Sequence, residues 1–80
     1  MSAAEAQEVK SLLLRSNEQY RQLSERHHEL DDRLQQLSSQ SYLTESDHFE
    51  EIKLKKRKLA LKDQMERMAL EYAKSHFTAS

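Results

Sequence analysis

The chain has no glycine and no proline in its 80 residues, and this absence limits its possible folds more than any other feature. Glycine commonly ends helices and occupies tight hairpin turns, whereas proline breaks helices and shapes loops. β-Branched residues are also scarce, since there are one Val, one Ile and two Thr. The residues that dominate instead, such as Leu, Glu, Lys and Ala, mostly favour helix. The sequence therefore predicts an all-α protein with a single domain over residues 1–80.

Composition also excludes several classes of protein. Charged residues make up 34% and hydrophobic residues 36% of the chain, proportions that are typical of a coiled coil. With no cysteine, the chain has no disulfide framework and no thiolate site. The N-terminus lacks the apolar core of a signal peptide, and the longest apolar run, Leu12–Leu14, is far too short to span a membrane. We expect a cytoplasmic protein with no membrane span.

An apolar seam with helical spacing runs through the first half of the chain. Its steps of three and four residues, or their multiples, place the side chains on one face of a helix. We expect one continuous helix over about residues 4–40. The seam consists of Val9, Leu13, Tyr20, Leu23, Leu30, Leu34 and Leu37, with Ser16 and His27 at polar positions.

The seam is interrupted by the serine-rich segment 38–41, whose hydroxyl groups compete for backbone hydrogen bonds and weaken helix. Thr44 then provides a helix N-cap, and Asp47 completes a variant capping box with Asp in place of Glu. We place a turn at about 41–44 and a second helix at about 45–75. A turn this short predicts an antiparallel two-helix hairpin with coiled-coil packing.

The second helix has two apolar sides about 160° apart at 100° per residue. The expected hairpin register places Asp31 beside Lys55. The inner side contains Leu54, Leu61, Met65, Met68 and Tyr72, with Lys58 as a polar interruption. The outer side contains Phe49, Ile52, Leu59 and Leu70. One partner helix covers only one side, so a lone hairpin leaves the outer side in water. We expect these outer residues to contact a second copy, forming a helical bundle, or a helix of another protein.

A block of basic residues overlaps the second helix. It consists of Lys53, Lys55, Lys56, Arg57, Lys58 and Lys62. Such a block is also found in proteins that bind nucleic-acid phosphates or an anionic membrane surface. Here the six charges point all around the helix, and acidic neighbours dilute their field. A solvated, salt-bridged surface is the favoured interpretation, and binding to nucleic acid or an anionic membrane surface is the alternative function.

Residues that carry catalytic or metal chemistry are poorly represented. His27 and Asp31 lie four residues apart on one helix face, as do His28 and Asp32. No third metal ligand follows at a fixed spacing, so we interpret His27 as a polar position in the seam and expect no metal. No serine lies in a nucleophile motif. The sequence therefore predicts neither an enzyme nor a cofactor.

Two stretches match a pattern found in small bacterial proteins. The first contains His27, Leu30 and Asp31, and the second contains Leu54, Lys55, Lys56, Lys58, Leu59, Leu61, Lys62, Asp63 and Met65. Over about residues 20–70 the chain resembles the YdcH-like family, a domain of unknown function. The resemblance implies a bacterial, cytosolic helical hairpin and no known activity. With the two apolar sides of the second helix, we predict a non-enzymatic protein–protein interaction or adaptor module.

Overall fold

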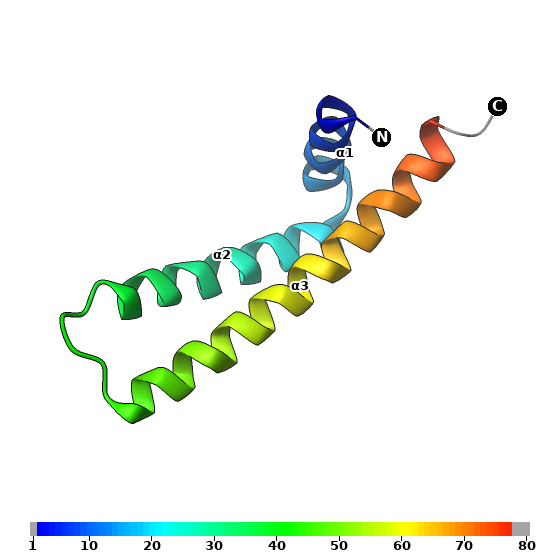
Figure 1. Cartoon of the computed structure of the whole chain (residues 1–80). Helices are drawn as coiled ribbons and strands as arrows, with labels where there is room; N and C mark the ends of the chain where they lie inside the picture. The colour runs from blue at the N-terminus through cyan, green and yellow to red at the C-terminus, as the bar shows by residue number, and fades with distance from the viewer. Residues whose placement is uncertain (1, 78–80) are drawn as a thin grey trace.

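A computed structural model describes residues 2–77, which form three α-helices: α1 (Ala3–Ser16), α2 (Glu18–Ser38) and α3 (Glu45–Phe77) (Figure 1). These residues contain no strand, so the predicted all-α class is confirmed. The molecule is elongated, with extents of 55 × 19 × 19 Å. Residues 1 and 78–80, which the expected single domain includes, lie outside the described part of the chain.

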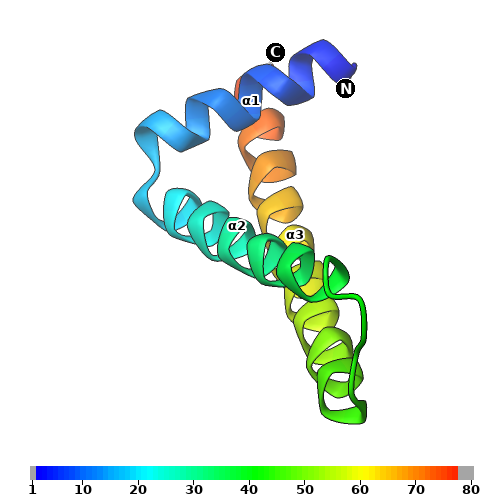
Figure 2. The ribbon, with the colours of Figure 1, turned by 90° about the vertical axis from the view of Figure 1, so that its left-hand side faces the viewer.

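Helices α2 and α3 run antiparallel and are joined by residues 39–44 (Figures 1 and 2). The start of α3 is fixed by the capping box that the sequence predicts. The Asp47 backbone N–H donates to Thr44 Oγ1 at 3.1 Å, and the Thr44 N–H donates to Asp47 Oδ2 at 3.0 Å. This reciprocal pair satisfies two backbone donors that a helix start otherwise leaves unpaired. The helix continues to Phe77, beyond the expected end at residue 75.

The expected continuous helix over 4–40 is wrong, because the chain changes direction at Asn17. This residue is extended, with φ −123° and ψ 112°. Its side-chain Oδ1 accepts a hydrogen bond from the Tyr20 N–H at 2.9 Å, and its own N–H donates to the Leu13 carbonyl at 2.8 Å. Asn17 therefore ends α1 and begins α2. Asparagine is among the best N-cap residues and stabilises a helix start by about 1 kcal/mol relative to alanine.

Two side chains next to Asn17 satisfy further carbonyl groups at the end of α1. Ser16 Oγ donates to the Leu12 carbonyl at 2.7 Å, and Arg21 Nε donates to the Leu14 carbonyl at 3.1 Å. The change of direction carries α1 across the C-terminal half of α3 (Figure 2). The two-helix hairpin of the sequence prediction is thus corrected to a hairpin with a third helix packed on it.

The position of α1 creates a core that the simple hairpin would lack. Tyr20 is 2% exposed and lies in this core. Its burial raises the pKa of the phenol above the ordinary value of 10.0, and the nearby Glu66 carboxylate acts in the same direction. The cluster consists of Val9, Leu13, Tyr20, Ala69 and Ala73, with Met65, Met68 and Tyr72 packed against it. Along the hairpin, the buried residues are Leu23, Leu30 and Leu54.

The register of the hairpin differs from the expected one by about one turn. Asp31 accepts a hydrogen bond from the Lys58 ammonium, not from Lys55. Lys55 pairs instead with Glu51 of its own helix, at 3.1 Å. The connection between α2 and α3 consists of residues 39–44 and is longer than the expected turn at 41–44. This extra length allows α3 to shift along α2 by one helical turn. A slide of three or four residues preserves the helix face, so the apolar pattern does not resist it.

The Asp31–Lys58 ion pair makes the stability of the fold depend on pH in the acidic range. The hydrogen bond from Lys58 holds the pKa of the Asp31 carboxyl below its ordinary value of 3.8, and the charges of Lys58, His27 and His28 add to this effect. Because the folded pKa is lower than the unfolded one, the pair stabilises the fold above about pH 4. This contribution is lost as the pH falls through the lowered pKa.

We therefore expect Asp31→Asn to show a shallower loss of stability than the wild type as the pH falls below about 4. Urea unfolding at a series of pH values, followed by circular dichroism, measures this slope. Asp32→Asn is the matched control, because Asp32 is exposed and has no ion pair among residues 2–77. Equal acid slopes for the wild type and Asp31→Asn would show that the pair does not contribute.

Candidate interaction surface

The outer side of α3 carries four large apolar side chains in solvent. Phe49 is 67% exposed, Ile52 52%, Leu59 61% and Leu70 51%. We call these four residues the outer stripe. They lie on the side of α3 away from Leu54, which is 2% exposed and faces the hairpin core. At 1.5 Å per residue, the outer stripe extends for about 31 Å along the helix.

The spacing of the outer stripe is that of a helix–helix seam. Steps of three and four residues lead from Phe49 through Ile52 to Leu59, with Lys56 at the intervening polar position. Asp63 continues the same series toward the C-terminal part of α3. Leu70 lies beside Ala6 and Lys10 of α1, at the edge of a small hollow. Leu70 is therefore the member of the outer stripe that lies next to α1.

The structure separates the members of the basic block. Lys58 is half-buried and bound to Asp31, whereas Lys55 is bound to Glu51. Arg57 lines a groove between α2 and α3. The remaining members, Lys53, Lys56 and Lys62, are exposed at different angles around the helix. The block thus contacts several separate neighbours and does not form one continuous basic surface.

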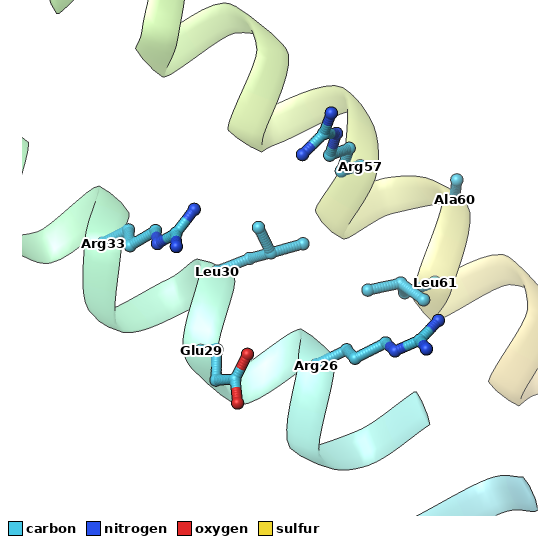
Figure 3. A pocket seen from close by; sticks show the side chains of 7 residues that line it. All are labelled: Arg26, Glu29, Leu30, Arg33, Arg57, Ala60 and Leu61. Carbon is cyan, nitrogen blue, oxygen red and sulfur yellow. The ribbon is translucent and has the colours of Figure 1, made fainter. Parts of the chain in front are cut away.

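An open pocket of about 460 Å³ lies in the groove between α2 and α3. Its volume is within the range of about 300–1,000 Å³ that is typical of small-molecule sites. Figure 3 shows Leu30 of α2 and Leu61 of α3 reaching toward each other, with arginine side chains around them. The residues that line the pocket are Arg26, Glu29, Leu30, Arg33, Arg57, Ala60 and Leu61.

The sequence analysis did not single out Arg26 or Arg33, although a signal was present. The two residues are seven positions apart, so they lie on the same face of α2 on either side of Leu30. Their relation to Arg57 depends on the register of the hairpin, which the sequence pattern does not fix. The arginine-lined pocket is therefore visible only once the two helices are placed together.

The histidines of α2 are not gathered with acidic residues into a larger site. His27 is half-buried and lines a second hollow with Tyr20 and Lys58. Within residues 2–77, no three His, Asp or Glu side chains are arranged to hold a metal ion. No helix in this part of the chain has the length and apolar character needed to cross a membrane.

Residues 2–77 thus form a small three-helix fold that exposes an apolar helix face and an open groove. Residues 21–69 match the family described as Protein of unknown function (DUF465), and the chain belongs to this family. The matched region covers most of α2 and α3 and does not include α1. No curated protein and no solved structure matched the chain. The finer YdcH-like name remains a prediction.

Proposed function

We propose that this protein is a non-enzymatic interaction module that binds another helix along the outer stripe of α3. The observation that carries the proposal is the exposure of four large apolar residues along one side of α3, each more than half exposed. Full burial of one such side chain contributes about 1.5–3 kcal/mol. A partner helix with a matching seam would remove these side chains from water.

A second copy of the chain is the partner that the charges in the stripe favour. Two α3 helices in antiparallel orientation bring Lys56 of each copy toward Asp63 of the other. A parallel, in-register pair would instead place Lys56 against Lys56 and Asp63 against Asp63, which is repulsive. The antiparallel pair is also two-fold symmetric, the commonest arrangement of homodimers. The favoured partner is thus a second copy of the chain, and the alternative is a helix of another protein.

The double variant Ile52→Lys, Leu59→Lys tests this function. Both residues are exposed in the chain, so the fold of one copy should be preserved. Loss of two apolar contacts at an interface should raise the dissociation constant by at least about a hundredfold. Analytical ultracentrifugation over a range of concentrations is expected to show a dimer for the wild type and a monomer for the variant.

A matched control is Gln19→Lys, Gln22→Lys, which adds the same charge at two exposed positions of α2. This control should remain dimeric. If the wild type is a monomer and captures a partner only with Ile52 and Leu59 intact, the partner is a helix of another protein. If the Ile52→Lys, Leu59→Lys variant keeps both its oligomeric state and its partners, the proposed function fails.

Binding to nucleic acid or an anionic membrane surface receives no comparable support. Lys55 and Lys58 of the basic block are already paired with carboxylates of the same chain. A salt series separates the two functions, because binding to phosphates weakens steeply with salt and an apolar helix interface does not. The cytoplasm remains the expected location of the protein.

A further inference from the structure

The arginine-lined pocket between α2 and α3 has an unbalanced charge. Arg26, Arg33 and Arg57 surround it, and Glu29 is the one acidic residue among those that line it. Within residues 2–77, none of these three arginines has a hydrogen bond or ion pair to a carboxylate. This contrasts with the opposite side of the hairpin, where Asp31 neutralises Lys58. Three like charges around one hollow repel one another, and a bound anion would relieve this repulsion.

The floor of the pocket is apolar. Leu30 is 9% exposed, and Leu61 is half-buried opposite it. In Figure 3, Arg33 and Arg57 lie toward one end of these leucines and Arg26 lies toward the other. Ala60 adds a small side chain, which leaves space above the floor. The pocket thus combines paired positive charges at one end with an apolar surface beside them.

We propose that this pocket binds an amphipathic anion, with its phosphate or carboxylate group between Arg33 and Arg57 and its apolar portion over Leu30 and Leu61. Guanidinium groups suit such a head group because they donate two parallel hydrogen bonds to its oxygens. The apolar portion extends toward Arg26, whose aliphatic stem covers it while the charge stays in water. The site lies in the groove and is separate from the outer stripe.

Titration of the full chain with decyl phosphate, below the concentration at which it forms micelles, tests the proposal. Isothermal titration calorimetry is expected to show saturable binding that is at least about tenfold tighter than binding of inorganic phosphate, because only decyl phosphate covers the leucines. Arg33→Gln, Arg57→Gln should weaken decyl phosphate binding by at least about tenfold. Arg26→Gln should have a smaller effect. Ala60→Leu, at an exposed position, should also weaken binding because it fills the space above the floor.

The matched control is Lys56→Gln, Lys62→Gln, which removes two exposed charges from α3 outside the pocket. It should bind decyl phosphate within about threefold of the wild type, a difference below 1 kcal/mol. Absence of saturable binding, or an equal loss in this control, would overturn the proposal. So would equal affinity for inorganic phosphate and decyl phosphate.

Vesicles of anionic phospholipid distinguish a lipid head group from a free amphiphile as the source of the anion. Vesicle binding that is lost in Arg33→Gln, Arg57→Gln identifies the lipid as the source and supports the pocket. Decyl phosphate binding without vesicle binding identifies a free amphiphile and also supports it. Vesicle binding that survives the double substitution, without saturable binding of decyl phosphate, would assign the attraction to other basic residues and overturn the proposal.

Discussion

Replacement of Leu54 by alanine is expected to lower the free energy of unfolding by about 2–5 kcal/mol. Leu54 is 2% exposed and is the most buried side chain that α3 contributes to the hairpin. The substitution removes apolar contacts with α2 and leaves a cavity that the surrounding helices fill incompletely. A single core in a chain of this size rarely contributes more than about 3–5 kcal/mol, so the loss is comparable to the whole stability.

Urea unfolding followed by far-ultraviolet circular dichroism measures the effect of Leu54→Ala. Leu14→Ala is the control, because it deletes the same atoms from a residue that is 40% exposed. The control should change the unfolding free energy by much less than Leu54→Ala. Equal shifts of the two midpoints would show that the hairpin core is not where the structure places it.

A second large effect is expected at the junction of the three helices. Tyr20→Ala should lower the free energy of unfolding by about 3–5 kcal/mol, the range found for removal of a buried aromatic ring. Tyr20 packs in one cluster with Val9 of α1 and Ala73 of α3, so its loss weakens the docking of α1 most directly. Hydrogen exchange should therefore rise first in residues 3–16, at concentrations of urea that leave α2 and α3 protected.

Tyr20→Phe provides a close control for the alanine variant. It keeps the ring and removes only the phenolic hydroxyl. The expected change is below about 1 kcal/mol, and the protection of α1 should be retained. If Tyr20→Ala leaves the exchange of residues 3–16 unchanged, α1 does not depend on this ring for its docking.

Rules based on neighbouring residues were sufficient to predict the start of α3. They were insufficient to predict that the first half of the chain forms two helices. Thr44 and Asp47 form the predicted cap because a helix start is decided within four residues. The sequence analysis missed the break at Asn17 because the apolar residues keep their helical spacing across it. The same spacing is compatible with one continuous helix and with two helices that meet at an angle. What favours the reversal is tertiary: Val9 becomes fully buried against small residues of α3, which allow helices to approach closely.

The outer stripe and the arginine-lined pocket also differ in how far the sequence alone predicts them. Helical periodicity assigns Ile52 and Leu59 to the side of α3 away from the hairpin, because a helix wheel needs no knowledge of the partner. The pocket around Arg33 and Arg57 requires the register of two helices, and that register depends on the length of the connection. The Asp31–Lys58 pair was missed for this reason, although each residue had been assigned to the correct helix.

The change of direction at Asn17 also sets an order in which the chain assembles. Asp31 and Lys58 are 27 residues apart, so the hairpin closes a short loop. Val9 meets Ala73 only after residue 73 has been synthesised, and closure of this longer loop costs more entropy. We therefore expect the hairpin to form first and α1 to dock last. During synthesis on the ribosome, we expect the apolar face of α1 to stay exposed to solvent, or bound to a chaperone, until the C-terminal part of α3 has left the ribosome.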